Sequence, residues 1–396
     1  MKNILYGISA TALIIGMLVF AYSQSWIIFN FPHLTYDTVH PEHVHTIAKK
    51  MATISYYDAP KIQTEEREII WSTNHTKNLT TLTQNWLALL DEEELLEKRA
   101  TLQIATIEAN EQTGVLSFDR APFNEADPAH IKHMYIEGLL CTVQDHLPLL
   151  KNIRFLVHHQ PLNDYHLDFA RPWPVTGFSY CNDHSTTKPT PPTSTSFTIM
   201  LDPAGDAQNT GRIIGDNFER GISLQFAQAL KHYLERELDQ VRVILSRFPG
   251  ETLEPLQNAA FANRLATNLY VSLHFYPEAQ SHTHWYTYTF AYDPITDFWN
   301  KNTPAYTFIP YYHAHEPYTQ ISWYYIKTMQ EILMLYHTKG MFELMEPCAL
   351  PFKPLIGVNL PAIGHEIGLA RKDDWKLYIE PLAKSLIATV ENILQT

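Results

Sequence analysis

Basic residues are scarce in this chain. Lysine and arginine total 29 against 42 aspartates and glutamates, which gives a net charge of −13 with neutral histidines. Binding to phosphate groups needs clustered Lys and Arg, and no basic run appears anywhere in the sequence. The sequence therefore argues against a nucleic-acid partner and against a polybasic lipid anchor.

Cysteine is also rare, with only three residues in the chain (Cys141, Cys181 and Cys348). Three cysteines so far apart fit neither a disulfide framework nor the paired spacing of a cysteine-bound zinc site. The composition is otherwise globular, with 45% hydrophobic and 18% charged residues. A length of 396 residues suits two domains, each large enough to bury its own core.

The first residues contain the one long apolar run. Lys2 precedes a stretch from Ile4 to Tyr22 that is long enough to cross a bilayer as a helix. The positive charge before the run, with none directly after it, places the N-terminus in the cytoplasm and the bulk of the chain outside. We expect a signal anchor or transmembrane helix over 1–24, in the cytoplasmic membrane of a cell envelope. A cleavable signal peptide ending at Ala21-Tyr22-Ser23 is the alternative, and it also exports the protein.

The rest of the chain divides at a low-complexity segment rich in Ser, Thr and Pro, DHSTTKPTPPTSTS, which we interpret as a linker over 183–196. Before it we expect a juxtamembrane stalk over 25–64 and an α+β domain over 65–182. The pattern there predicts strand, helix, strand, strand, helix, strand. The predicted elements are 67–72, 79–96, 102–107, 115–118, 131–147 and 153–158.

Three segments of this α+β domain, LSFDRAPF, IEGLLCTV and IRFLVHHQPLNDYHLDFARPWP, resemble the GerM-type domain of spore germination and sporulation proteins. The resemblance covers roughly residues 65–175 and implies a non-enzymatic module, of a kind often found beside wall hydrolase domains. Its last segment holds residues with the spacing of a metal cluster, but in the family this stretch is strand and turn, so we assign them a structural role. They are His158, His159, Asp164, His166 and Asp168.

After the linker, strands and helices alternate over 197–396, which predicts an α/β sandwich with a largely parallel sheet. In such sheets, functional groups gather at the carboxyl ends of the strands. Asp202, His274 and Glu366 all stand at predicted strand ends. We therefore expect these three side chains near one edge of the sheet.

Five segments of this domain resemble the zinc-dependent N-acetylmuramoyl-L-alanine amidase family, in the family's order. They are TIMLDPAGDAQNTGR, FERGISLQFAQALKHYL, VRVILSRF, AAFANRLATNLYVSLHF and LPAIGHEIGLARKDDW. The resemblance implies a peptidoglycan hydrolase that cleaves the amide between N-acetylmuramic acid and L-alanine. On the family's motifs, Glu219 and His274 stand at zinc-ligand positions, and Glu366 stands at the position of the catalytic glutamate. A catalytic zinc needs three such ligands and an open position for water.

One ligand of the family pattern is missing, because Gly205 stands where the family has a histidine. We expect Asp206 to take its place as an oxygen ligand. A histidine from elsewhere is a second possibility, and the pairs His282/His284 and His313/His315 have the alternation that puts both imidazoles on one face of a strand. The third possibility is a pseudo-amidase that has lost hydrolysis but still binds peptidoglycan or envelope partners. His365 points to the opposite side from Glu366 if the segment is extended.

Overall fold

The computed structural model describes residues 48–178, 186–190, 196–254, 256–278, 283–292 and 310–394. The expected transmembrane helix and most of the expected linker lie outside the described residues. Within the described residues, no helix is both long and apolar enough to cross a membrane. Residues 47–396 form one compact unit. Below, the N-terminal lobe is residues 48–178, and the C-terminal lobe is residues 196–394.

The N-terminal lobe begins earlier than we predicted. A stalk was expected to residue 64, but β1 (Ala48–Asp58) and β2 (Lys61–Trp71) form a long antiparallel hairpin. Ala52, Ile54, Ser55 and Tyr57 of β1 are buried, and Ser55 N–H donates to Thr142 Oγ1 at 2.8 Å. The strand β1 was missed because its first four residues are all exposed, which breaks the alternation of apolar residues.

The next five elements follow the predicted order of helix, strand, strand, helix and strand, with ends that shift by a few residues. The two short strands after them were not predicted. Asn74 caps the first helix by accepting a hydrogen bond from Lys77 N–H, and Leu79, Leu82 and Trp86 bury its apolar face. The second helix connects two parallel strands of a five-stranded sheet. The elements are α2 (His75–Glu92), β3 (Leu102–Ile107), β4 (Thr113–Phe118), α3 (Ala129–His146), β5 (Asn152–Val157), β6 (Gln160–Pro161) and β7 (Trp173–Pro174).

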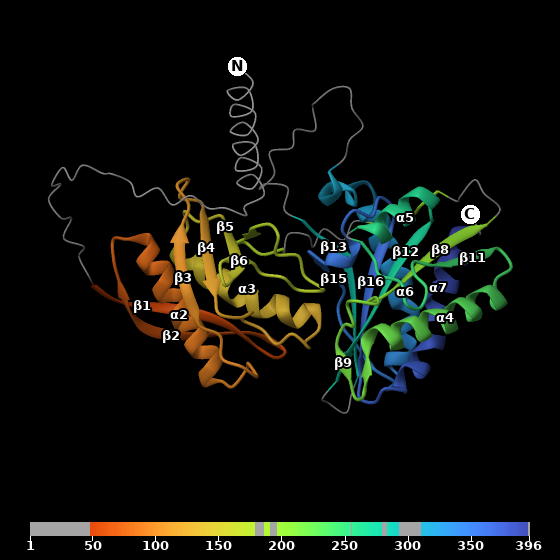
Figure 1. Ribbon diagram of the computed structural model, residues 1–396, viewed down its shortest axis with the longest axis horizontal. Coiled ribbons are helices and arrows are strands. Elements are labelled where there is room, and N and C mark those ends of the chain that lie inside the picture. Colours follow the sequence, from red (N-terminus) through yellow and green to blue (C-terminus); the bar gives the residue numbers. More distant parts are fainter. Residues whose placement is uncertain are drawn as a thin grey trace, which may run out of the picture. The chain divides into compact units, whose positions relative to one another are not determined.

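The C-terminal lobe has a seven-stranded sheet in the order β11-β8-β12-β16-β13-β14, with β15 paired to β13 (Figure 1). The sheet is mixed, because β13 runs antiparallel to β16 while the other neighbours are parallel. Its strands are β8 (Phe197–Pro203), β11 (Val241–Leu245), β12 (Leu269–Pro277), β13 (His284–Phe290), β14 (Glu343–Leu344), β15 (Cys348–Leu350) and β16 (Ala362–Leu369).

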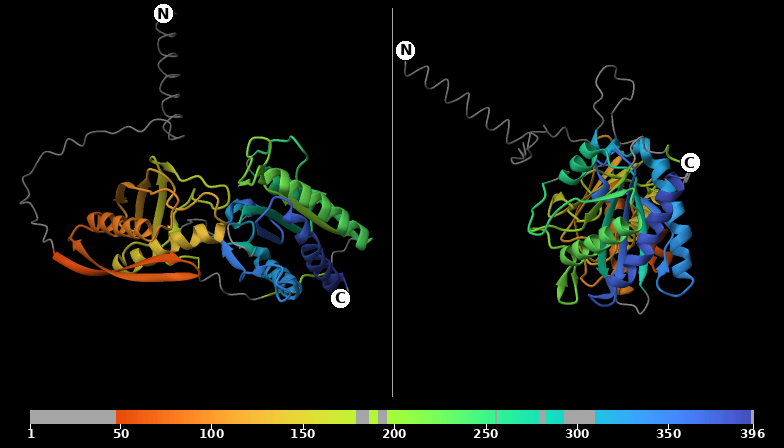
Figure 2. Two further views of the ribbon diagram at one scale, coloured as in Figure 1. Left: turned by 90° about the horizontal axis from the view of Figure 1, so that it is seen from below. Right: turned by 90° about the vertical axis from the view of Figure 1, so that its right-hand side faces the viewer.

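The two faces of this sheet bury different partners, because successive strand residues point to opposite sides. Ile199 and Val271 pack with α4 (Glu219–Glu237), α6 (Thr319–His337) and α7 (Ile379–Leu394), which lie on one face (Figure 2). Met200 and Tyr270 point the other way, into a core shared with α5 (Gln257–Leu265) and the N-terminal lobe. Side chains on this second face therefore meet the N-terminal lobe.

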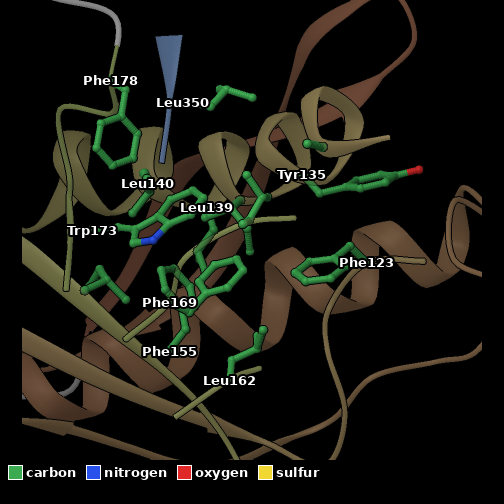
Figure 3. Close-up of a cluster of buried hydrophobic side chains, with 14 of the residues drawn as sticks. Phe123, Tyr135, Leu139, Leu140, Phe155, Leu162, Phe169, Trp173, Phe178 and Leu350 are labelled. Atoms are coloured by element: carbon green, nitrogen blue, oxygen red, sulfur yellow. The ribbon is translucent and has the colours of Figure 1, made fainter. Parts of the chain in front are cut away.

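The two lobes share one continuous hydrophobic core. Leu350 of β15 belongs to the same cluster as Leu140, Trp173 and Phe178 of the N-terminal lobe (Figure 3). Backbone contacts reinforce the junction: Leu167 forms a bridge with Phe352, and two hydrogen bonds flank it. Asp168 N–H donates to Pro351 O at 2.9 Å, and Lys353 N–H donates to His166 O at 2.7 Å.

Candidate metal centre

His274 and Glu366 come together because β12 and β16 are parallel neighbours in which these two residues are register partners. Both follow the alternation of Tyr270 and point to the sheet face that meets the N-terminal lobe. His365 points to the other face, where its Nδ1 accepts a hydrogen bond from Trp285 Nε1 at 3.1 Å. The expected orientation of His365 is confirmed, and it lies away from the site.

Glu219 is the first residue of α4 and is fully buried, at 0% exposure. Its Oε1 accepts a hydrogen bond from Phe275 N–H at 3.0 Å, and its Oε2 accepts one from Arg212 N–H at 3.0 Å. Burial alone raises the pKa of such a carboxyl, but the Arg212 guanidinium and two imidazoles hold the pKa of Glu219 well below its usual value. Glu219 is therefore an anion inside the protein.

The imidazole of His274 is oriented by a chain of hydrogen bonds. Its Nε2 lies 2.8 Å from Ser272 Oγ, and Ser272 Oγ donates to Asp202 Oδ2 at 3.3 Å. Because that hydroxyl hydrogen is used on Asp202, the serine oxygen accepts from Nε2–H, which leaves a lone pair on Nδ1. Nδ1 is buried, has no hydrogen-bond partner in the described part of the chain, and lies 3.5 Å from Glu219 Oε1.

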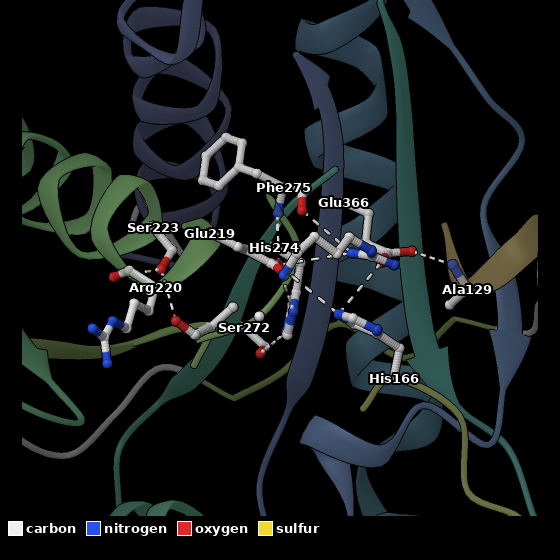
Figure 4. Close-up of polar contacts among 12 residues, drawn as sticks. Ala129, His166, Glu219, Arg220, Ser223, Ser272, His274, Phe275 and Glu366 are labelled. Carbon is white, nitrogen blue, oxygen red and sulfur yellow. Dashed lines mark hydrogen bonds and ion pairs between the residues drawn. The ribbon is translucent and has the colours of Figure 1, made fainter. Parts of the chain in front are cut away.

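A histidine from the N-terminal lobe completes this group. His166 Nε2 lies 3.9 Å from Glu219 Oε1, and the His166 and His274 rings are 5.1 Å apart between centroids (Figure 4). Burial, and then the nearby Arg212 charge, lower the pKa of His166 to about 4, so its imidazole is neutral. His166, Glu219 and His274 are the one group within the described residues whose ligand atoms, all within 4.8 Å of one another, are spaced to hold a metal ion.

Asp206, which we expected as the replacement ligand, is not in this group. Its Oδ1 accepts hydrogen bonds from the N–H groups of Gln208 and Asn209, and its Oδ2 accepts from Leu253 N–H. The carboxylate therefore organises the loop in which it stands. That loop also explains Gly205, whose φ of +74° strains other residues and whose added Cβ would lie 2.7 Å from Arg220 Cβ.

The described histidines of the two alternative pairs, His284, His313 and His315, do not enter the site. His284 Nδ1 lies 2.9 Å from Glu278 Oε2, and His313 Nδ1 lies 2.6 Å from Glu316 Oε1. His315 packs its ring against Phe290. His282 lies outside the described residues.

Glu366 is buried beside the group and accepts three hydrogen bonds. Arg212 Nη2 donates to its Oε1 at 2.8 Å, and Tyr288 OH donates to its Oε2 at 2.7 Å. Ala129 N–H also donates to Oε2, at 2.6 Å (Figure 4). Burial raises the pKa of this carboxyl, but Arg212 and the neighbouring imidazoles outweigh it and hold the pKa below its usual value. His166 Nε2 lies 4.0 Å from Oε1.

A pocket of about 330 Å³ opens onto the group and is lined by both lobes. Asn163 and Tyr165 come from the N-terminal lobe, and Tyr165 is 60% exposed. Lys353 stands between the two lobes, because its Nζ donates to Asn163 Oδ1 at 3.1 Å and to Asp164 O at 3.0 Å. A ligand that enters this pocket would therefore touch both parts of the chain.

The three side chains fit a zinc ion in chemistry and spacing. Two ligand atoms on one tetrahedral zinc lie roughly 3.4 Å apart. The distances of 3.5 and 3.9 Å from Glu219 Oε1 to the two imidazole nitrogens are close to that value. The buried Nδ1 of His274, which has a free lone pair and no hydrogen-bond partner among the described residues, is suited to bind a metal ion. Sequence reasoning missed His166 because its strand-and-turn context favoured a structural role.

Solved structures of amidases are similar to this chain over about half of its length. The catalytic domain of CwlV, an N-acetylmuramoyl-L-alanine amidase from Bacillus (Paenibacillus) polymyxa var. colistinus, is 16% identical and covers 50% of this chain and 98% of its own, with a TM-score of 0.36. The N-acetylmuramoyl-L-alanine amidase of Clostridium difficile 630 is 19% identical and covers 51% and 99%, also at 0.36. CwlD of Clostridioides difficile, solved with the GerS lipoprotein, is 19% identical and covers 50% and 99%, at 0.36.

No curated protein matches the chain. Residues 199–377 match the Amidase_3 family of N-acetylmuramoyl-L-alanine amidases. The match is confined to the C-terminal lobe, covers less than half of the chain, and includes Glu219, His274 and Glu366. It supports an amidase and gives no information on the N-terminal lobe. Residues 199–377 of the C-terminal lobe are thus similar to the N-acetylmuramoyl-L-alanine amidase family.

Proposed function

We propose that this protein is a metal-dependent peptidoglycan hydrolase that cleaves the amide between N-acetylmuramic acid and L-alanine. The observation that supports this most is the convergence of Glu219, the first residue of α4, and His274 of β12, whose Oε1 and Nδ1 atoms lie 3.5 Å apart inside the segment that matches the amidase family. Glu366 lies next to them in register. The pocket above this group gives a substrate access to it.

Glu219 and His274 would both be ligands of a zinc ion. When bound, zinc supplies Lewis acidity toward the amide carbonyl and makes a water molecule more acidic. Glu366 Oε1 accepts the proton of the attacking water as the new C–O bond forms, and it passes that proton to the departing nitrogen as the C–N bond breaks. Ser272 and Asp202 hold the His274 ring in the orientation that presents Nδ1.

The test is a hydrolysis assay on purified peptidoglycan with the full chain, purified in detergent and supplied with zinc. Mass spectrometry should find released peptides that begin with L-alanine, and none should appear after Glu366→Gln. Glu125→Gln, on the exposed surface of the N-terminal lobe, serves as the matched control and should leave release unchanged. Equal release by wild type and Glu366→Gln would contradict the proposed role of that carboxylate.

A second candidate function is favoured by the contacts of Glu366. Arg212, Tyr288 and Ala129 N–H occupy both of its oxygens, and a carboxylate with a lowered pKa is a weaker proton acceptor. In this reading the protein is a pseudo-amidase that binds wall fragments or envelope partners. A pseudo-amidase should release no peptides as wild type, and it should bind muropeptides equally well before and after Glu366→Gln.

We further propose that the chain is exported and anchored in the cytoplasmic membrane by residues 1–24, with the N-terminal lobe as a GerM-like module. The support is the apolar run after Lys2 and the segments that resemble the GerM-type domain. Protease added to intact spheroplasts should digest the lobes if they face outward. Protection of both lobes until the membrane is permeabilised would place them in the cytoplasm instead.

A further inference from the structure

The amidase pattern of this chain lacks one metal ligand, since Gly205 occupies the family's histidine position. Two ligands hold zinc weakly, and catalytic zinc sites have three protein ligands. The loop cannot easily restore the missing one, because Gly205 has φ +74° and an added Cβ would also lie 2.7 Å from Asn209 O. A third ligand must therefore come from another part of the chain.

We propose that His166 of the N-terminal lobe is the third metal ligand, so that the metal centre is built from both lobes and the N-terminal lobe is part of the active site. This inference deepens the proposed function, because it assigns the ligand that the amidase domain itself does not supply. His166 Nε2 faces Glu219 Oε1 at 3.9 Å, and its ring meets His274 edge to face, with an interplanar angle of 77°. The resulting His, Glu, His set is of the kind that holds catalytic zinc.

Hydrogen bonds to the backbone N–H and C=O groups of His166 hold this residue in place. Its own N–H donates to Asp164 Oδ1 at 2.9 Å, and its carbonyl oxygen accepts from Lys353 N–H at 2.7 Å. The next residue, Leu167, forms a bridge with Phe352 of the C-terminal lobe. A histidine anchored this way across a lobe junction has little freedom, which lowers the entropy cost of binding a metal.

A buried ion pair fixes the segment from the other side. Lys132 of α3 contacts Asp164 Oδ2 at 2.6 Å, and the two side chains are 1% and 5% exposed. Asp164 thus links α3 to the backbone of His166 and Leu167. Burying both charges costs free energy that is offset only when the two side chains meet in good geometry, so this pair fixes the position of the segment that carries His166.

The arrangement also implies that metal binding couples the two lobes. Ligands on both sides of the junction bind the ion only when the lobes are docked, so the metal stabilises the docked form in proportion to its affinity. If the N-terminal lobe carries a ligand, it is required for metal binding. A lobe that served only as a separate targeting module would not be required for metal binding.

The test compares zinc binding by the full chain, purified in detergent and stripped of metal, with binding by two variants. His166→Phe keeps a ring between His274 and Phe352 but offers no ligand, and His166→Ala removes the ring as well. His75→Ala is the matched control, an exposed histidine of the same lobe. Calorimetric titration gives the stoichiometry and affinity, and thermal unfolding gives the stabilisation by zinc.

Wild type and His75→Ala should bind one zinc and unfold roughly 5–10 °C higher with excess zinc. Both His166 variants should lose more than about 100-fold in affinity, beyond the loss typical of outer-shell changes, and most of the thermal shift. With cobalt in place of zinc, the visible absorption bands of wild type should change in the His166 variants.

Zinc binding of unchanged affinity in both His166 variants, or no zinc binding by wild type, would overturn this inference. Its failure is distinguishable from failure of the proposed function. If zinc binds through His166 but no peptides are released, His166 is a metal ligand and the proposed hydrolase function is wrong. If peptides are released and zinc binds equally well without His166, the hydrolase function stands and the assignment of His166 is wrong.

Discussion

Nε2 of His166 lies 3.9 Å from Oε1 of Glu219, although the two side chains belong to different lobes of the chain. The distance is short because the 166–168 segment pairs with residues 351–353 and delivers the imidazole to the C-terminal sheet. Gly205 stands where the resemblance to the amidases implies a histidine, and the lobe junction places His166 against Glu219 and His274.

Returning the family's histidine should not rebuild the family's site. Gly205→His places a side chain at φ +74° and against Arg220 Cβ, so it should lower the free energy of unfolding by about 1–3 kcal/mol without raising zinc affinity. Urea unfolding and zinc titration check both parts. Comparing Gly205→Ala with Gly215→Ala isolates the clash, because Gly215 also has positive φ (+62°) but nothing lies within 4 Å of its added Cβ.

Breaking the buried Lys132–Asp164 pair should lower the free energy of unfolding much more than breaking an exposed ion pair. Lys132→Met leaves Asp164 buried without its partner and should lower the free energy of unfolding by about 3–5 kcal/mol. Lys49→Met, which removes a pair whose side chains are 77% and 50% exposed, should cost less than about 1 kcal/mol. Similar losses in urea unfolding of the two variants would contradict the assigned roles.

The hydroxyl of Ser272 should matter for metal affinity. Ser272→Ala removes the hydrogen bond that orients His274, and we expect a loss of about 10- to 100-fold in zinc affinity. Ser385→Ala removes another buried hydroxyl, which donates to Leu382 O in α7, far from the site. That control should change stability without changing zinc affinity.

Glu137 should make stability depend on pH. Burial raises the pKa of its carboxyl from 4.5 to about 7, and the neighbouring His133 stays neutral because burial lowers its pKa to about 3. Between pH 4.5 and 7 the unfolded chain ionises Glu137 while the folded chain keeps the proton, so the contribution of Glu137 to stability falls as pH rises through this window. Buried histidines with lowered pKa values, such as His133, act in the opposite direction below about pH 6.5, so the effect of Glu137 is the difference between wild type and a Glu137 variant. The loss is roughly 3 kcal/mol at most.

The measurement is the free energy of unfolding from pH 4 to pH 8. The free energy of unfolding of wild type minus that of Glu137→Gln should fall between pH 4.5 and 7, whereas wild type minus Glu125→Gln should stay constant. A difference for Glu137→Gln that does not change across this window would contradict the raised pKa of Glu137.

Periodicity alone predicted most of the fold. The helices at α2, α3, α4, α6 and α7 and the strands around His274 and Glu366 follow from patterns of 3.6 and 2 residues, which local sequence determines. A strand over 67–72 was predicted, but β1 and the first part of β2 were missed, because β1 begins with four exposed residues and Thr142, its partner across the lobe, is distant in sequence.

The candidate site could be predicted only in part. Glu219 begins α4, and His274 and Glu366 lie within neighbouring strands of the same domain, so the motifs of one domain are enough to identify them. His166 depends on how two lobes pack, and packing between distant segments leaves no periodic signal in the sequence. Asp206 was chosen for its proximity to Gly205 along the chain, but its oxygens serve the backbone of its own loop.

The most direct measurement is the zinc affinity of the full-length His166→Phe protein beside that of wild type. A centre shared between the lobes predicts one tightly bound zinc in wild type and a loss of more than about 100-fold in the variant. Equal affinity in the two proteins would mean that the N-terminal lobe contributes no ligand, and the account of a metal centre across the lobe junction would be wrong.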